Sequence, residues 1–238
     1  SDDGTVAVIG VHSPSVREHT VDSRSDKTAG LIIQYRLSDT GWSRGFYQHG
    51  DSIYDRFGSS VAISGDSNSI NVGAWGQNRN NNTTRPVPTN DIYTGSSVVL
   101  QHSSIHPTNS TPGWWEINDE IYGISAYDYE GDVVDISDDG TVIATATKFA
   151  HNNAGRVRIY KDFGDGNWTQ IGSDIIGESS EDHSGNDISL SDDGSTIAIG
   201  AKYNNGNGET SGHTRVYSSR RNDSSLLSLT EINTLDNG

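Results

Sequence analysis

The sequence predicts an all-β fold made of one antiparallel unit repeated along the chain. A Ser-Asp-Asp-Gly turn occurs at Ser1, Ser137 and Ser191, with a degraded copy, SGDSNS, at Ser64. Apolar and polar side chains alternate on either side of the turn, as in DISLS and TIAIGA, so one face of each strand is expected to be buried. Because the turn is too short for a parallel crossover, the strands on its two sides must pair antiparallel.

The strands recur in a fixed order around this turn. The strand after each turn is expected at Thr5–Gly10, Ser69–Ala74, Thr141–Thr147 and Thr196–Ala201. A third strand opens with a glycine, at Gly30, Gly95, Gly155 and Gly212. A fourth strand, starting at Gly41, Gly113 and Gly166, carries a tryptophan that we expect to be a packing residue, and LLSLTEIN from Leu226 takes its place in the last unit. The first strand of the next unit follows an Asp-x-x-Gly, at Asp55–Gly58, Asp128–Gly131 and Asp182–Gly185. Four short antiparallel strands in tandem units predict the blades of a β-propeller.

The first unit is incomplete, because no first strand precedes its turn at Ser1. We expect a single propeller domain or propeller fragment over residues 1–238, with repeats at about 1–57, 58–130, 131–184 and 185–238. The chain forms either a small four-bladed ring that closes imperfectly or a part of a larger ring or assembly. A blade that lacks one strand leaves backbone groups unpaired and can accept a strand from another chain.

Composition alone gives a conflicting indication. Leu, Ile, Val and Phe together make up about a fifth of the chain and the net charge is -16, values close to those of disordered proteins, but the repeated strands overrule that interpretation. The negative charge argues against a nucleic-acid partner. The chain has no Cys and no Met, and no apolar run long enough to enter a membrane. We expect a soluble, processed or excerpted chain.

Two stretches resemble a known repeat family. FGSSVAIS at Phe57 and INVGAW at Ile70 look like the FG-GAP repeat of integrin-α-type β-propellers. The last unit, from Ser184 to Tyr217, also resembles tandem repeats in large secreted proteins of marine bacteria and algae. The resemblance implies a propeller that works outside the cell. Integrin-type blades often carry a calcium loop between their first two strands, but here only the tight turn stands at that position, so calcium is not carried over to it.

The repeated aspartates and glycines are predicted to shape turns. An Asp before a strand can accept hydrogen bonds from backbone N–H groups, and Gly tolerates a positive φ. The alternative, repeated catalytic carboxylates, is the weaker interpretation. The predicted turn residues are Asp55, Gly58, Asp128, Gly131, Asp182, Gly185, Asp139, Gly140, Asp193 and Gly194.

No cofactor is clearly indicated, although two segments rich in oxygen donors are candidate calcium sites. The candidate ligands are Asp162, Asp165 and Asn167 in the first segment, and Asn205 and Asn207 in the second. Asp-Gly and Asn-Gly pairs are also typical of hairpin turns, so a turn remains the competing interpretation. The eight His residues show no metal-binding spacing.

Loops are the expected place of binding and modification. Sequons for N-glycosylation occur at Asn81, Asn82, Asn109, Asn167 and Asn222. Trp75 stands at the entrance of a long loop, where it could stack on a sugar. The long connectors Val11–Ala29 and Trp75–Thr94 are of the kind that carry binding sites.

The sequence therefore favours a noncatalytic, extracellular structural or adhesive module. Its expected partners are other protein chains or copies of itself, and glycans are a further possibility. One alternative is a lectin-like glycan-binding propeller, and another is calcium-dependent adhesion. A third is a propeller glycoside hydrolase, which needs two carboxylates about 5 to 9.5 Å apart in a pocket. No Gly-x-Ser-x-Gly motif and no Cys is present to provide a nucleophile.

Overall fold

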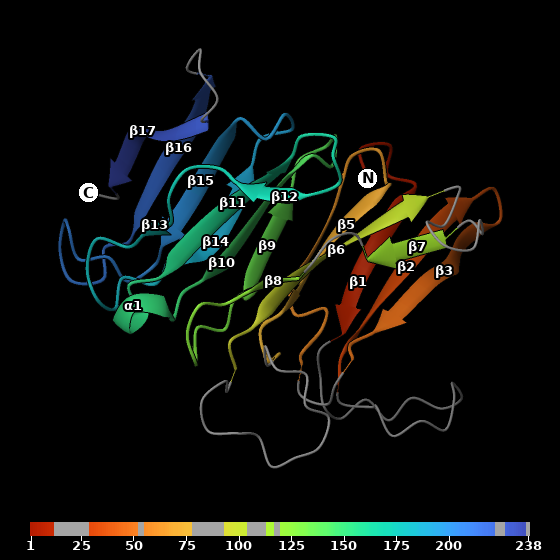
Figure 1. The fold of residues 1–238 in the computed structure, drawn as a ribbon, viewed down its shortest axis with the longest axis horizontal. Coiled ribbons are helices and arrows are strands. Elements are labelled where there is room, and N and C mark those ends of the chain that lie inside the picture. The colour runs from red at the N-terminus through yellow and green to blue at the C-terminus, as the bar shows by residue number, and fades with distance from the viewer. Residues whose placement is uncertain are drawn as a thin grey trace.

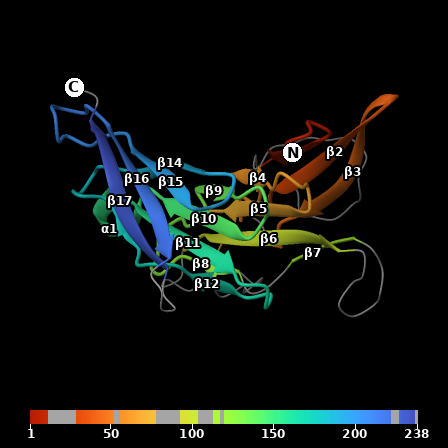
Figure 2. The same cartoon turned by 90° about the horizontal axis from the view of Figure 1, so that it is seen from above.

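The fold is all-β and propeller-like, with four antiparallel sheets in chain order (Figure 1). The computed structural model describes residues 1–11, 29–51, 55–77, 93–103, 113–116, 120–221 and 227–236, of which 103, 115, 220–221 and 227–236 are described by their backbone alone. Seen from above, the sheets follow one another in a curved array, with the first and the fourth at opposite ends (Figure 2). The predicted fold class is confirmed.

Each sheet is formed by one stretch of the chain. The first contains β1 (Val6–Val11), β2 (Leu31–Ser38) and β3 (Gly41–His49). The second contains β4 (Val61–Ile63), β5 (Ser69–Ala74), β6 (Ser96–Ser103), β7 (Gly113–Glu116) and β8 (Ile121–Tyr122). The third contains β9 (Val133–Ile136), β10 (Val142–Thr147), β11 (Arg156–Asp162), β12 (Trp168–Gln170) and β13 (Ile175–Ile176). The fourth contains β14 (Ser184–Leu190), β15 (Thr196–Ala201), β16 (His213–Arg221) and β17 (Leu227–Asp236).

The strand that follows each turn lies where the alternation places it. β5 and β15 have the predicted bounds, and β1 and β10 begin one residue later than expected. The fourth strand is broken in two sheets, because β7 and β8 both pair with β6, and β12 and β13 both pair with β11. One short turn, α1 (Ala150–Asn153), is assigned as helical; it is too short to cross a membrane, as is every helix among the described residues.

The core lies between successive sheets rather than within one. One cluster, which includes Ile32 and Val72, joins the first sheet to the second. A second cluster, which includes Val99 and Ile143, joins the second to the third. The largest cluster, which includes Ile197, joins the third to the fourth. Each inner sheet is therefore covered on both faces, whereas an end sheet is covered on one.

The first sheet has three strands among the described residues, as its missing first strand predicts. β1 pairs only with β2, whereas β5, β10 and β15 each pair on both sides. One edge of β1 thus carries backbone groups without a strand partner in the described part of the chain. This edge is the unpaired one that the sequence predicts.

The expectation that the tryptophan of each fourth strand is a packing residue is wrong for the first sheet. Trp114 in the second sheet is 8% exposed and stacks on Phe46 of the first sheet at a centroid distance of 5.6 Å. Trp42 holds the equivalent position in the first sheet and is 52% exposed. Among the described residues no sheet lies on the outer side of the first one, so Trp42 has no neighbouring sheet to pack against.

Candidate functional site

One network of hydrogen bonds holds each Ser-Asp-Asp-Gly turn and the degraded copy. The turn joins the first two strands of the second, third and fourth sheets and precedes β1 in the first sheet. In the third sheet, Ser137 Oγ donates to Asp139 Oδ1 at 2.7 Å and accepts the backbone N–H of Val142 at 3.0 Å. Asp139 Oδ1 also accepts the backbone N–H of Thr141 at 2.9 Å. Gly140 follows with a φ of 70°, which a glycine adopts without strain.

The same network recurs in the other three turns, although one of them has lost its glycine. Ser67 takes the glycine position of the second turn and has a φ of 63°. Backbone and side-chain hydrogen bonds hold the pKa of Asp3 and Asp193 at about 2. Burial alone would raise the pKa of Asp66 and Asp139. Hydrogen bonds from the turn act in the opposite direction and are together stronger, so the pKa of each residue lies below its usual value. These carboxylates bind the backbone.

The four turns also form a continuous row along one end of the array. Asp2 N donates to Gly65 O at 3.3 Å, Asp66 N donates to Asp138 O at 3.4 Å, and Asp138 N donates to Asp192 O at 2.9 Å. Residual burial, and then the charges of Asp192 and Asp2, raise the pKa of Asp138. Among the described residues, no three acidic or His side chains are grouped in a way that could hold a metal ion.

The Asp-x-x-Gly aspartates lie at the opposite end of the sheets and are buried. Asp128 Oδ2 accepts the backbone N–H groups of Ile124 and Ser125, both at 2.9 Å, and the carboxylate is 6% exposed. Asp182 Oδ2 accepts the backbone N–H of Ser179 at 2.8 Å and the amide of Asn204 at 3.0 Å. Asp55 is 4% exposed. Asp128 and Asp182 thus fix the turns that lead into the third and the fourth sheet.

The glycine that ends each Asp-x-x-Gly touches the sheet before it. The carbonyl of Gly58 lies against Gly10, and the carbonyl of Gly131 lies against Gly73, so a side chain at Gly10 or Gly73 would collide with backbone. In the third sheet Ala146 holds this position and faces Gly185 of β14, where a β-bulge interrupts the ladder. Contact between neighbouring sheets therefore depends on small residues here.

A buried ionic network lies beside Asp128. Arg156, which is 2% exposed, donates from Nη2 to Asp128 Oδ2 at 2.9 Å and to Glu130 Oε2 at 2.7 Å. Arg158 Nη2 lies 3.1 Å from the same Glu130 oxygen. Burial alone would lower the pKa of Arg156. The negative charges of Glu130 and Asp128 act in the opposite direction and are stronger, so the pKa of Arg156 is raised. The network joins the linker between the second and third sheets to β11.

Next to this network, aromatic side chains from the second, third and fourth sheets and the linkers between them form what we call the aromatic row. Trp75 meets Tyr129 at a ring-centroid distance of 5.6 Å, and Tyr129 meets Phe149 at 5.1 Å. Phe149 meets His183 at 6.1 Å, and His183 meets Tyr203 at 4.9 Å. Tyr129 and His183 are the residues that follow the aspartate of an Asp-x-x-Gly, and each has a φ of 54°.

Trp75, the predicted sugar-stacking residue, is half-buried at one end of this row. The guanidinium of Arg56 lies over its ring, 5.3 Å from the centroid, and Tyr129 meets it edge-on. The predicted binding loops that flank Trp75 and Val11 fall mainly in residues 78–92 and 12–28, which lie outside the described residues. Exposed aromatic surface is instead found farther along the row.

An open depression, which we call the groove, adjoins the aromatic row and has a volume of about 670 Å³. It lies between the linker that joins the second sheet to the third, residues 124–129, and the turn 149–153 that includes α1, near the lower end of these sheets in Figure 1. Tyr127 is 52% exposed and Phe149 is 37% exposed. Asn152 and Asp174 supply polar groups to the lining, so the groove combines aromatic faces with hydrogen-bonding groups.

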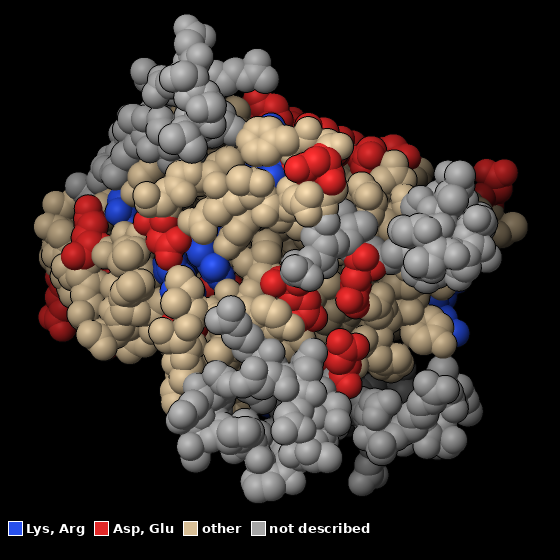
Figure 3. Space-filling view, viewed as in Figure 1, with Lys and Arg blue, Asp and Glu red and all other residues tan. Residues whose placement is uncertain are grey.

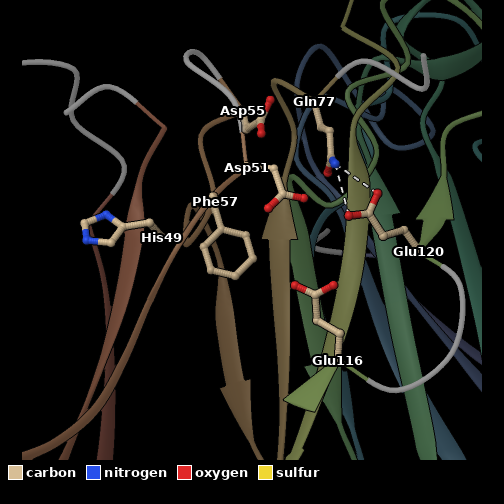
Figure 4. A pocket seen from close by; sticks show the side chains of 8 residues that line it. His49, Asp51, Asp55, Phe57, Gln77, Glu116 and Glu120 are labelled. Carbon is tan, nitrogen blue, oxygen red and sulfur yellow. Dashed lines mark hydrogen bonds between the residues drawn. The ribbon is translucent and has the colours of Figure 1, made fainter. Parts of the chain in front are cut away.

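A second cavity, between the first and second sheets, collects carboxylates. Figure 4 shows Asp51, Asp55, Glu116 and Glu120 around it, with Gln77 donating to Glu120 at 2.9 and 3.0 Å. Burial and the charge of Asp51 raise the pKa of Glu116, although a hydrogen bond from Gln48 opposes the rise. The cavity has a volume of about 10 Å³, which admits one water molecule at most. It has no room for a sugar ring.

The candidate calcium ligands lie in two separate segments, and three of them accept hydrogen bonds from the backbone, whereas Asn167 Nδ2 donates to Asp165 O at 3.4 Å. Asp162 Oδ1 accepts the N–H of Gly164 at 2.7 Å, and Asp165 Oδ1 accepts the N–H of Asn167 at 3.0 Å. Asn205 Oδ1 accepts the N–H of Thr210 at 2.6 Å, and Asn207 is exposed. The structure does not bring the two segments together into one site.

Of the predicted glycosylation sites, one can be placed. Asn167 is exposed in the hairpin between β11 and β12, where a glycan would meet solvent. Asn81, Asn82, Asn109 and Asn222 lie outside the described residues.

Sequence reasoning missed the residues that line the groove. Tyr127 precedes an Asp-x-x-Gly aspartate, and Phe149 lies two residues beyond β10, at the position that Tyr203 holds after β15. An aromatic residue at equivalent places in successive repeats was the available signal. Which loops approach each other depends on how the sheets pack, and no single repeat contains that information.

Comparisons with known proteins support the repeat and the fold. Residues 51–85 match the family model described as FG-GAP repeat. No match was found among curated proteins. A solved structure of the periplasmic gluconolactonase PpgL of Pseudomonas aeruginosa is similar, with a TM-score of 0.50 and 14% identity over 99% of this chain.

The chain spans 55% of the length of that lactonase. A putative 6-phosphogluconolactonase of Bacteroides fragilis aligns with 100% of this chain and 84% of its own length, at a TM-score of 0.36 and 11% identity. At these identities the likeness concerns the fold alone. The matched stretch 51–85 begins before Asp55 and includes β4 and β5. The chain therefore carries an FG-GAP repeat, in the second sheet of a propeller-like fold.

Proposed function

We propose that the chain is a noncatalytic structural or adhesive module that works outside the cell and assembles with further copies of itself through the two end sheets. The observation that carries this proposal is an apolar sheet face that is covered in the inner sheets and open in the first. The small size of the carboxylate cavity between the first two sheets further supports a noncatalytic role.

The open face belongs to the first sheet, on the side turned away from the second, and we call it the leading face. Directly opposed residues of an antiparallel pair share a face, and Ile9 opposes Ile33, which opposes Tyr47. Leu37 opposes Trp42 on the same face. Four of its side chains are large, apolar and exposed: Ile9 (51%), Leu37 (44%), Trp42 (52%) and Tyr47 (43%). An exposed apolar patch of this kind marks an interaction surface.

The inner sheets show what covers such a face. Ile9 comes directly before Gly10, and the residues that come before the equivalent Gly73, Ala146 and Gly200 hold the same place in the other sheets. These residues are almost inaccessible to solvent: Val72 (0%), Thr145 (0%) and Ile199 (1%). In each of these cases a preceding sheet provides the cover. The chemistry that fits the leading face is therefore another sheet of the same repeat.

The fourth sheet carries the complementary surface, which we call the trailing face. Its residues on β15 and β16 are small, with Ala198, Gly200, Thr214 and Val216 all partly exposed, and Asp187 of β14 opposes Gly200. Gly10 and Gly73 each meet a carbonyl of the next sheet, whereas a side chain added at Gly200 would find nothing nearer than the carbonyl of Asp187 in its own sheet, at 3.6 Å. The site that receives a following sheet is thus open.

The two end faces are the two halves of the contact that joins sheets within the chain. Between the third and fourth sheets, Ala144 and Ala146 pack with Ile197 and Ile199, and the small side chains of the trailing face can receive the large ones of the leading face in the same way. A second copy joined trailing face to leading face makes a head-to-tail contact, which closes into a ring or continues as a filament. Two copies supply eight sheets, within the range of about four to eight blades seen in propellers.

The test is the mass of the purified chain in solution, measured by light scattering after gel filtration from about 1 to 100 μM, a range typical of moderate affinities. We expect a concentration-dependent dimer or larger species, and a monomer for the Ile9→Asp, Trp42→Asp double variant. Phe163→Asp is the matched control, because Phe163 is 60% exposed and lies on a hairpin away from both faces.

A wild-type chain that stays monomeric throughout this range would contradict the proposal. Equal masses for the wild type and the double variant would also contradict it, because assembly would then use another surface. Electron microscopy of the assembled species distinguishes a closed ring from a filament.

A further inference from the structure

We propose that the groove binds a neutral oligosaccharide, with the rings of Tyr127 and Phe149 as the stacking surface and Asn152 and Asp174 as hydrogen-bonding partners. This inference goes beyond assembly, because the groove lies on neither end face. The ligand class follows from three properties of the groove: its exposed rings, its charge and its fixed shape.

The first property is a concentration of exposed apolar surface. Ten large hydrophobic side chains are exposed among the described residues, and four of them line the groove: Ile124 (59%), Tyr127 (52%), Phe149 (37%) and Ile176 (39%). Tyr203 continues the same surface along the aromatic row. A ring that leaves half of its area in water is available to a ligand with a flat apolar face. The C–H face of a pyranose provides such a surface.

The second property is charge, which excludes an anionic ligand. Arg156 is the one Lys or Arg among the lining residues, and it is 2% exposed and bonded to Asp128 and Glu130. The ammonium of Lys148 lies over the ring of Phe149, 5.0 Å from its centroid, and is paired with Asp132 at 2.7 Å. The molecule as a whole carries a net charge of -16, and acidic side chains are spread across the face drawn in Figure 3. A sulfated or carboxylated sugar would find no unpaired Lys or Arg in this lining, where His151 is the other basic side chain.

The lining instead offers groups that suit hydroxyls. The Asn152 side chain is exposed and makes no hydrogen bond within the described part of the chain, so its donor and acceptor are both available. Asp174 is 26% exposed; its Oδ1 accepts from Gln170 Nε2 at 2.9 Å and its Oδ2 lies 3.8 Å from Arg156 Nε, and its remaining lone pairs can accept from a hydroxyl. A neutral sugar satisfies an amide and a carboxylate at the same time, since every hydroxyl both donates and accepts.

The aromatic side chains do not form a cage for a quaternary ammonium group, which is the other ligand that aromatic rings and a carboxylate suit. Tyr93, Tyr127 and Tyr129 pack on one another with centroid distances of 5.8 to 6.3 Å. Rings that are already in mutual contact leave no space between them for a cation. What they present is a platform rather than an enclosure.

The third property is that the platform is held in place before a ligand arrives. The buried carboxylate of Asp128 fixes the backbone of Ile124 and Ser125 on one side of the groove. On the other side, Asn153 Nδ2 donates to both oxygens of Glu181, at 3.0 and 3.1 Å. A preorganised surface loses little conformational freedom on binding, so even a small sugar contact yields measurable affinity.

The experiment titrates the purified full chain with cellohexaose, laminarihexaose, mannohexaose and chitohexaose by calorimetry, beside polygalacturonate and tetramethylammonium. We expect at least one neutral oligosaccharide to bind with a Kd between about 10 μM and 1 mM. Tyr127→Ala should weaken that binding at least about tenfold, whereas Tyr127→Phe, which keeps the ring, should retain it. Asn152→Ala should weaken it by a smaller factor of about three.

Phe163→Ala is the matched control, because it removes an equally exposed ring from the hairpin after β11 and should leave binding unchanged. Gel filtration of Tyr127→Ala separates this proposal from the assembly proposal, since the variant should assemble as the wild type does. No binding of any neutral oligosaccharide up to about 10 mM overturns the inference. Preference for polygalacturonate or tetramethylammonium, or equal affinity in Tyr127→Ala, overturns it as well.

Discussion

At the scale of single residues, one type of side chain has different structural roles at the two ends of the sheets. The aspartates of the Ser-Asp-Asp-Gly turns are exposed or half-exposed and accept hydrogen bonds from their own turn. Asp128 and Asp182 are buried and hold the chain between two sheets. Sequence position, not residue type, decides which role an aspartate has.

The buried network around Glu130 provides the sharpest test at this scale. Glu130 is 0% exposed and balances Arg156 and Arg158, so its removal leaves two buried cations with too little negative charge. Glu130→Ala should lower the free energy of unfolding by about 3–5 kcal/mol, measured by urea denaturation. Glu209→Ala, at an exposed loop position, is the control and should change it by less than about 0.5 kcal/mol. Similar losses in both variants would show that the network does not stabilise the fold.

At the scale of elements, the alternation and the turns were enough to place most strands. The bounds of β5 and β15 follow from Ile and Val at every second position between a turn and a Gly-Ala pair. The Glu130–Arg156 pair and the groove could not be predicted in this way. Each joins residues from different repeats, and their meeting depends on the packing of one sheet on the next, which leaves no periodic signal in the chain.

The contact between sheets leads to a prediction with an internal control. Gly73 lies against the carbonyl of Gly131, and Gly200 lies against no other sheet. Gly73→Ala should therefore cost about 1–3 kcal/mol of stability through overpacking, while Gly200→Ala should be nearly neutral in the monomer. Thermal unfolding of the two variants at low protein concentration measures the difference. An equal loss of stability in both variants would mean that each glycine is needed for the conformation of its own strand and not for the contact with the next sheet.

At the scale of the whole molecule, the four turns act together in the response to acid. Asp3, Asp66, Asp139 and Asp193 have pKa values below that of an unfolded aspartate. Their stabilisation is complete above the unfolded pKa of about 3.9 and is lost as the pH falls through the folded pKa. Burial raises the pKa of Asp135 and Glu116, so these two groups act in the opposite sense and favour the folded state as they take up protons.

We therefore expect Asp193→Asn to lose less thermal stability than the wild type between about pH 4 and pH 2. The window follows from the pKa of Asp193, which is about 2. Melting temperatures measured by circular dichroism at several pH values provide the comparison, with Glu209→Gln as a control that removes one acid outside the turns. If both variants lose as much stability as the wild type, the turn carboxylate is not responsible for the acid response.

The glycine-to-carbonyl contact has a consequence for how such a chain can change over generations. At two of the three boundaries a residue without a side chain meets a peptide oxygen, and at the third an alanine takes the glycine position. Since no specific side chain is needed at this point, duplication or deletion of one module leaves this part of the junction compatible.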